Sequence, residues 1–434
     1  MSKPKIIIQF NEANFDLISK YLDQYDLPGF KKILNFNTKI ITNSEKEYEH
    51  LEPWIQWYSF YTGLSFREHN VFHLGDCNKN FHTTFTEEIA NNRSVGIFGS
   101  MNLKYSDKYD IFIPDAWSDS KTDNSYSSKL IASLIKRIVN TNTKLKISFK
   151  DIISLIFLVG IPLKFSDLKI LLISFLSLLK KSRVNLASIL DYYFLNYSLK
   201  RIKKNKINTS MIFLNGFAHI QHHYMLSSKF INGKNPKWYS KDSVDPFLNS
   251  LRIYDQLFNQ LILKYDVSHD IWIITGLTQK PYENPLIYWR ISNPKKIFQN
   301  FLNSKFTINQ RMSRDFEIVV EEEKDLNDIY RFLTDATIKN VDQSTRAFGH
   351  IDKTGKKSLF ASFIYKEESK NAILQYGNKS INLNDEIEFV AIKNGEHAEH
   401  GWAYSNAIIE KNSSNLLPIT NLHKIILNDN LKTY

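Results

Sequence analysis

Residues 209–223 read Thr-Ser-Met-Ile-Phe-Leu-Asn-Gly-Phe-Ala-His-Ile-Gln-His-His and hold three of the twelve histidines of the chain. The stretch opens as a short apolar run and becomes polar at Asn215. His219, His222 and His223 then follow at helical spacing. Open α/β sheets place their chemistry where a buried strand ends in a polar turn and passes into a helix. The stretch therefore predicts a functional site at this turn.

Other apolar runs end in polar turns in the same way: 5–10 before Asn11, 270–274 before Thr275, and 388–392 before Glu396. Uninterrupted runs of β-branched residues are typical of strands that are buried on both faces of a parallel sheet. Helical patterns lie between the runs. The predicted fold is therefore α/β, with a doubly wound, mostly parallel sheet whose polar turns converge on one crevice.

The length of 434 residues allows one large α/β domain with insertions. We predict an α/β core in three parts, with a helical insertion or cap and a small α+β subdomain between them. In chain order these are core 1–129, insertion 130–206, core 207–297, subdomain 298–385 and core 386–434.

The composition excludes several classes of protein. The formal net charge is +11, but the lysines are spread along the chain and no nucleic-acid motif is present, so we expect no nucleic-acid partner. The single cysteine, Cys77, excludes an intramolecular disulfide and a cysteine-based zinc site. The N-terminus lacks the long apolar core of a signal peptide, which predicts a cytoplasmic protein.

The predicted insertion contains two apolar segments, 152–163 and 168–179, surrounded by lysines. Each is too short to span a bilayer, which needs about 20 residues. One interpretation is a buried helical cap. The other is an interfacial hairpin that contacts an anionic membrane through residues 150–183.

An aromatic stretch at 50–76 combines rings at helical spacing with polar side chains. Trp54 and Trp57 belong to the ring pattern, which is typical either of a helix packed in the core or of a platform for sugar rings. Glu52, Gln56 and His69 supply acid–base and amide groups in the same stretch.

Five motifs in order along the chain resemble the alkaline phosphatase superfamily, especially its type I phosphodiesterase and nucleotide pyrophosphatase branch. They are Ile-Ile-Ile-Gln-Phe-Asn-Glu-Ala-Asn-Phe-Asp at 6–16, the Thr-Gly segment at 57–71, Asn215-x-x-x-His219, Thr275-Gly276 and His397-Ala-Glu-His-Gly401. The resemblance implies two divalent metals bound by Asp and His, with a Thr or Ser nucleophile.

The chain departs from that pattern at the charged positions. Asn11 and Asn215 stand where the family has aspartates, Thr275-Gly276 replaces an Asp-His pair, and Pro53 falls at the nucleophile position. Asparagine does not neutralise a dication as a carboxylate does. We therefore expect at most one divalent metal, zinc or manganese. Its predicted ligands are His219 and His397, and His222 and His223 are predicted to be structural.

The predicted catalytic residues are Glu52, His219 and Glu12. The predicted substrate-binding residues are Asn11, Trp54, Gln56, Trp57, His69, Asn215, Gln279 and His400. This set suits acid–base chemistry on a phosphorylated substrate. The predicted function is a hydrolase or transferase for a phosphate-containing or glycosyl substrate of surface-glycan metabolism. The alternative is an inactive member that acts as a binding or scaffolding protein.

Overall fold

The computed structural model describes residues 3–140, 185–240, 245–311, 314–339, 344–367, 372–409 and 416–427. The chain divides into two compact units, which are described separately. The first is Met1–Val139 with Ile147–Glu283 and Asn394–Tyr434, and the second is Asn140–Lys146 with Asn284–Lys393. The predicted insertion lies partly outside the described residues, and the segment 150–183 lies entirely outside them.

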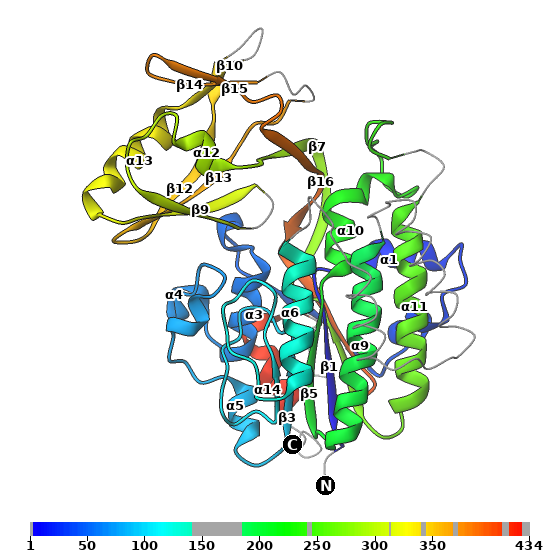
Figure 1. The fold of residues 1–434 in the computed structure, drawn as a ribbon. Helices are drawn as coiled ribbons and strands as arrows, with labels where there is room; N and C mark the ends of the chain where they lie inside the picture. The colour runs from blue at the N-terminus through cyan, green and yellow to red at the C-terminus, as the bar shows by residue number, and fades with distance from the viewer. Residues whose placement is uncertain are drawn as a thin grey trace. The chain divides into compact units, whose positions relative to one another are not determined.

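The first unit is built on an eight-stranded sheet with the order β18-β2-β17-β6-β1-β5-β3-β4 (Figure 1). Its strands are β1 Lys5–Phe10, β2 Thr38–Asn43, β3 Val95–Phe98, β4 Ile111–Ile113, β5 Thr209–Leu214, β6 Asp270–Ile274, β17 His400–Ser405 and β18 Leu416–Pro418. β17 is antiparallel to both of its neighbours, and the other pairings are parallel. The predicted α/β fold with a mostly parallel sheet is thus confirmed.

β1 shows why the apolar runs become central strands. All six of its residues are buried. Ile6 and Ile8 face one apolar core, and Ile7 faces the other. Because both faces are covered by helices, the run shows no alternation of polar and apolar residues.

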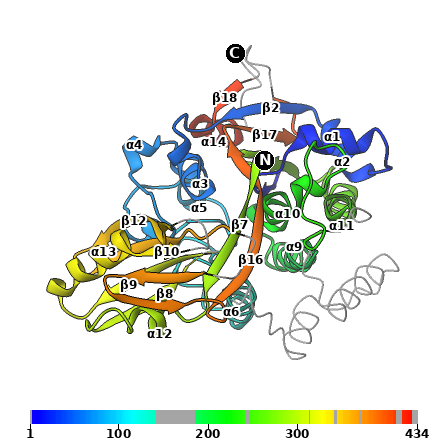
Figure 2. The same cartoon turned by 90° about the horizontal axis from the view of Figure 1, so that it is seen from above.

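Helices cover both faces of the sheet (Figure 2). The core that contains Ile6 includes residues of α1 Phe15–Leu22, α2 Pro28–Leu34, α6 Tyr126–Asn140, α9 Leu186–Asn205, α10 Gly216–Tyr224 and α11 Pro246–Tyr265. The core that contains Ile7 includes residues of α3 Pro53–Thr62, α5 Phe85–Ala90 and α14 Ile419–Leu427. The short helix α4, Phe66–His69, follows α3. No described helix is both long and apolar enough to cross a membrane.

The predicted strand at 388–392 forms, but it does not belong to the large sheet as expected. It belongs to β16, Ile387–Ala398, which pairs with β7, Thr278–Ile291, in a two-stranded sheet. The large sheet takes β17 instead. The expected polar turn around Glu396 is therefore strand, because β16 continues to Ala398.

The second unit holds two antiparallel sheets, β12-β13-β9-β8 and β11-β10-β14-β15. Their strands are β8 Phe306–Gln310, β9 Asp315–Val320, β10 Thr337–Lys339, β11 Ser344–Arg346, β12 Phe348–Gly355, β13 Ser358–Phe363, β14 Ile373–Tyr376 and β15 Lys379–Asn382. The helices are α12 Pro294–Phe298 and α13 Leu326–Asp335. Rings of Phe298, Phe316, Phe332 and Phe348 pack together in its core.

Candidate functional site

Glu12 is the second residue after the end of β1 and has a left-handed backbone, with φ at +58°. Such a conformation is uncommon for a residue other than glycine and costs of order 1 kcal/mol, so its surroundings must hold it. The Glu12 amide donates to Thr275 O at 2.9 Å, and Gln221 Nε2 donates to Glu12 O at 2.7 Å. The backbone is thus fixed on both sides, and the carboxylate is buried.

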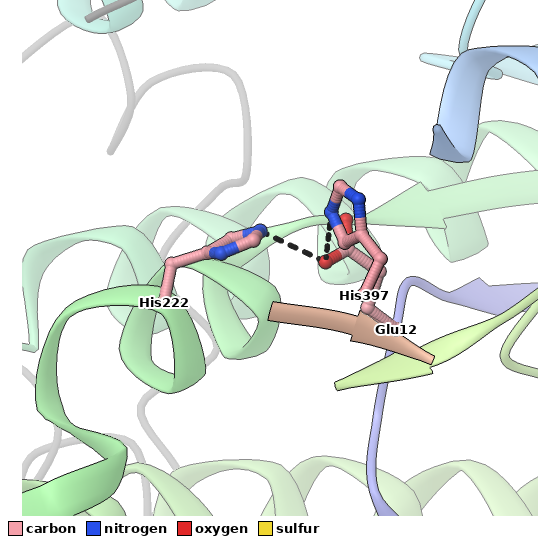
Figure 3. A group of neighbouring side chains, drawn as sticks. All are labelled: Glu12, His222 and His397. Atoms are coloured by element: carbon pink, nitrogen blue, oxygen red, sulfur yellow. Dashed lines mark ion pairs between the residues drawn. The ribbon is translucent and has the colours of Figure 1, made fainter. Parts of the chain in front are cut away.

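Two histidines converge on one oxygen of this carboxylate (Figure 3). His222 Nε2 of α10 lies 2.9 Å from Glu12 Oε2, and His397 Nε2 of β16 lies 3.3 Å from the same atom. His222 Nδ1 is 3.4 Å from Gly395 O on β16. Within the described part of the chain, this Glu12–His222–His397 cluster is the group of side chains that could hold a metal ion.

The charge of the cluster follows from its contacts. Burial by itself would raise the pKa of Glu12, but His222 and His397 outweigh burial and hold this pKa well below its usual range. Glu12 is therefore a carboxylate at neutral pH. Two imidazoles and one carboxylate form a ligand set that zinc and other divalent first-row metals accept.

Gln279 supplies an independent test of whether a cation fits. Its Nε2 donates to Glu12 Oε2 and, at 3.2 Å, to Ala218 O. Its Oε1 is buried and has no hydrogen-bond partner among the described residues, which costs about 1–3 kcal/mol. Rotating the amide would exchange the oxygen and the nitrogen. The oxygen would then face both the Glu12 carboxylate and Ala218 O, an arrangement that requires a cation between them. The cluster with Gln279 therefore fits one divalent cation.

Glu52 lies behind His397. It precedes α3 as its N-cap residue, and its side chain is one-third exposed. Glu52 Oε2 is 3.5 Å from His397 Nδ1, while His397 Nε2 faces Glu12. A carboxylate on the far nitrogen of a ligand histidine fixes the orientation of the ring and raises its basicity.

Neutral side chains fill the other side of Glu12. Asn11 Nδ2 donates to Glu12 Oε1 at 2.7 Å and to Asn215 Oδ1 at 2.8 Å. Asn11 Oδ1 accepts from Trp57 Nε1 at 2.7 Å. This Asn11–Asn215–Trp57 set satisfies its own hydrogen bonds, whereas two carboxylates in the same contact would require a cation or a proton between them.

The place of the family's Asp-His pair is closed by Trp57. Gly276 has φ at +75°, and a Cβ on it would lie 3.0 Å from the Trp57 ring. The hydroxyl of Thr275 accepts from the amide of Trp402 at 2.8 Å. The residues present therefore do not fit a second metal, because an indole and two amides stand where carboxylates and a histidine would be needed.

His219, predicted as a catalytic residue and a metal ligand, lies outside the cluster. Its ring packs against His223 at 4.5 Å between centroids. Burial, with His222 nearby, lowers the pKa of His219 to about 4, so it is neutral at pH 7. The structure places His397 beside His222 instead. α10 begins at Gly216, and the residue one turn beyond His219 is the one that reaches β16.

Trp54 and Gln56 of α3 make contacts that are structural. Trp54 Nε1 donates to Phe72 O at 2.7 Å. Gln56 Nε2 donates to His50 O at 2.8 Å, and Gln56 Oε1 accepts from the Glu45 amide at 3.2 Å. These bonds tie the loops on either side of α3 to the helix.

His69 and His400 also lie outside the cluster. His69 Nδ1 accepts from the Val71 amide at 3.0 Å, which leaves Nε2 to donate to Ser59 Oγ at 3.0 Å. Burial lowers the pKa of His69 to about 4, in keeping with a neutral ring. The His400 side chain is half exposed, and its nearest carboxylate is Glu399 at 3.5 Å.

Comparisons with known proteins identify similar folds. No protein-family model matches the chain, and no curated protein matches it. A phosphonoacetate hydrolase from Sinorhizobium meliloti 1021 is similar at 9% identity over 98% of this chain and 94% of that chain, with a TM-score of 0.45. Human ectonucleotide pyrophosphatase/phosphodiesterase 5 is similar at 11% identity over 98% of this chain and 94% of that chain, with a TM-score of 0.40. A variant of alkaline phosphatase PafA is similar at 11% identity over 97% of this chain and 95% of that chain, with a TM-score of 0.43.

These similar structures are of the kind that the sequence resemblance names. With TM-scores below 0.5 they bear on neither the ligands nor the chemistry of the site, for which the side chains of this chain are the evidence. The similarity to these three structures concerns the fold alone.

Proposed function

We propose that the chain is a hydrolase or transferase for phosphate-containing substrates that works with one divalent cation, zinc or manganese. The observation that carries the proposal is the convergence of His222 Nε2 and His397 Nε2 on a single buried oxygen of Glu12. The cluster lies where β1 ends and α10 follows β5, which is where open α/β sheets bind ligands. A cation held there would neutralise charge that develops on a phosphoryl group and would activate water.

The surrounding residues would orient the reactants. Glu52 holds the ring of His397, and Asn11 fixes the second oxygen of Glu12. Glu52 is also the partly exposed carboxylate of the group, and we assign it the role of accepting the proton of the attacking water or acceptor hydroxyl. Pro53 begins α3 at the position of the family's nucleophile. Since proline has no hydroxyl, the proposed reaction is direct displacement without an intermediate on that residue.

The substrate class is part of the same proposal. We propose a phosphate-containing glycan of surface-glycan metabolism. The contact of residues 150–183 with anionic lipid would suit a lipid-linked substrate, and this segment lies entirely outside the described residues. The cytoplasmic location also stays a prediction.

The test is metal-dependent turnover. The purified protein is treated with a chelator, reloaded with zinc or manganese, and assayed with phosphodiesters and sugar nucleotides. We expect Glu12→Gln and His222→Ala to lower kcat/KM by more than about 100-fold, because each removes a ligand. His219→Ala is the matched control from the same helix and should retain most activity. Equal losses in His219→Ala and His222→Ala, with all three variants folded, would contradict the proposed centre.

The alternative is a binding or scaffolding protein without catalysis. The Asn11–Asn215–Trp57 set favours it, since these side chains close half of the site with their own hydrogen bonds. This alternative predicts no thermal shift with zinc or manganese and no turnover of any phosphoester. A metal-dependent activity that His222→Ala abolishes would exclude it.

A further inference from the structure

Gly395 of β16 lies closer to α10 and β7 than a residue with a side chain could. A Cβ on Gly395 would be 2.9 Å from Gln221 O, a backbone atom of α10, and 2.3 Å from Gln279 Oε1 on β7. Both values are under 3.0 Å, so any side chain at this position would force a neighbour to move. The place of β16 against α10 therefore depends on the absence of a side chain at 395.

The carbonyl of Gly395 faces His222. His222 Nδ1 lies 3.4 Å from Gly395 O, while Nε2 of the same ring lies 2.9 Å from Glu12 Oε2. A carbonyl oxygen can only accept, so this contact requires the hydrogen on Nδ1. Nε2 is then the nitrogen left for a cation, which is how a contact on the far side of the ring orients a ligand histidine.

The same stretch of β16 carries the other histidine of the cluster. His397 is two residues after Gly395, and side chains two apart in a strand point to the same face. The rings of His222 and His397 have centroids 5.1 Å apart (Figure 3). Asn394 is buried, and its Oδ1 accepts from the Leu226 amide at 3.2 Å, which ties β16 to the chain just after α10. The spacing of the two rings thus follows from how closely β16 packs on α10.

We propose that Gly395 is a positioning residue for the divalent cation. By presenting no side chain, it lets β16 lie against α10 and Gln279, and its carbonyl orients the ring of His222. This inference rests on the proposed function and adds a residue that sets the spacing of two ligands without touching the cation. Contacts of this kind, one layer out from the ligands, change metal affinity by about 10- to 100-fold.

The test compares Gly395→Ala with an equally close contact elsewhere in the first unit. A Cβ on Gly29 of α2 would lie 2.2 Å from Asp255 O of α11, a backbone atom that cannot swing aside. At Gly395 the 2.3 Å contact is with the end of the Gln279 side chain, which can move. Gly29→Ala should therefore lose at least as much stability as Gly395→Ala. Urea denaturation of the metal-free proteins measures both losses.

Cation affinity should separate the two variants in the opposite order. Zinc binding is followed by competition with a chromogenic chelator. We expect Gly395→Ala to bind zinc about 10- to 100-fold more weakly than wild type, and Gly29→Ala to stay within about twofold of it. NMR of the ring nitrogens in zinc-saturated wild type should show the hydrogen of His222 on Nδ1, and Gly395→Ala should change that signal. Equal losses of zinc affinity in the two variants would overturn the inference, because affinity would then follow stability.

A second pair of variants covers the case in which Gly395→Ala does not fold. Gln279→Ala removes the atom at 2.3 Å, so that the 2.9 Å contact with Gln221 O is the closest one left when Gly395→Ala is added. The double variant should bind zinc about tenfold more weakly than Gln279→Ala alone. Equal zinc affinity within this pair would overturn the inference.

Failure of the proposed function looks different from failure of the inference. If wild type binds neither zinc nor manganese, the proposed function fails and the role of Gly395 fails with it. If wild type binds zinc and His222→Ala does not, while Gly395→Ala binds zinc as tightly as wild type, only the role of Gly395 is overturned.

Discussion

Glu12 separates a charged half of the site from a neutral half. On one side its Oε2 faces His222 and His397, and on the other its Oε1 accepts from Asn11. The charged half brings nitrogen and oxygen ligands together around a point that a cation can occupy. The neutral half brings Asn215 and Trp57 to Asn11 and completes its hydrogen bonds without one.

The difference shows that the two sides of one buried carboxylate can differ in what they need: the charged half has room for a cation, and the neutral half needs none. Replacing carboxylates by amides removes the repulsion that a cation would otherwise offset, and the amides then bond to each other. The indole of Trp57 fills the volume beside Gly276. Mutations in the charged half should therefore change cation affinity, and mutations in the neutral half should change the stability of the fold.

The largest expected effect of a change in the charged half is on its cation affinity. His222→Ala and His397→Ala should each weaken zinc or manganese binding by more than about 100-fold, because each removes one of three ligands. Binding is followed by competition with a chromogenic chelator. His219→Ala should stay within about twofold of wild type. A loss in His219→Ala that matched the other two would make His219 a ligand of the cation and contradict the Glu12–His222–His397 centre.

Trp57→Ala should destabilise the fold by about 3–5 kcal/mol, because it empties a fully buried indole site in the neutral half. Trp57→Phe keeps most of the volume but leaves Asn11 Oδ1 without its donor, and should cost about 1–3 kcal/mol. Urea denaturation at pH 7 measures both. A Trp57→Ala variant as stable as wild type would show that the indole does not hold this half together.

Asp191 of α9, which lies next to the start of α10, should make the free energy of unfolding depend on pH. Its Oδ2 accepts from the Gly216 amide at 2.7 Å and from the Tyr254 hydroxyl at 2.5 Å, and burial raises its pKa to about 7. The folded carboxyl thus keeps its proton at a pH where the unfolded one has lost it. Its contribution to stability is complete below about pH 4 and is lost as the pH rises to about 7, by roughly 1 kcal/mol per pH unit.

Asp191→Asn keeps an acceptor and removes the titration. Its free energy of unfolding should therefore vary less with pH between 4 and 7 than that of wild type. Urea denaturation at four pH values compares the two proteins. Parallel pH curves for Asp191→Asn and wild type would show that this carboxyl is already ionised in the folded state at low pH.

Asn11→Asp should destabilise the protein at pH 7 by about 2–3 kcal/mol, because it replaces a donor to Glu12 and Asn215 with a carboxylate. The cost should shrink at lower pH, where the new carboxyl can be protonated and donate. Adding zinc or manganese should not remove it, since Trp57 occupies the neighbouring volume. Full rescue by the metal would show that the neutral half can still take a cation.

The smallest expected effect comes from Glu52. Glu52→Gln should weaken cation affinity by about tenfold, because Glu52 acts through the far nitrogen of His397. If Glu52 is also the proton acceptor, kcat should fall further than the affinity, and the acidic limb of the pH–rate profile should disappear. A lowered affinity with an unchanged pH profile would restrict Glu52 to positioning.

The central strands could be predicted because burial on both faces leaves uninterrupted apolar runs in β1, β5 and β6. The sheet also contains β2 and β17, which have no uninterrupted apolar run and could not be predicted in this way. β2 reads Thr-Lys-Ile-Ile-Thr-Asn and is only partly buried, so its pattern resembles many surface segments. β17 begins with His400 and Gly401, the last two residues of the motif at 397–401, and this polar start resembles a turn rather than a strand.

The site was partly predictable for the same topological reason. Asn11, Glu12 and Asn215 follow neighbouring parallel strands, so their side chains meet at one edge. The choice between His219 and His222 was not predictable. Both lie on one side of α10 at helical spacing, and only the position of β16, which joins from far along the chain, decides between them.

The metal stoichiometry of the purified protein tests the central claim most directly. Inductively coupled plasma mass spectrometry after saturation with zinc or manganese and desalting should give one equivalent per chain in wild type. The same value is expected in His219→Ala, and close to none in Glu12→Ala or His222→Ala. Two equivalents in wild type, or one equivalent that survives both Glu12→Ala and His222→Ala, would contradict a single cation held by the charged half of the site.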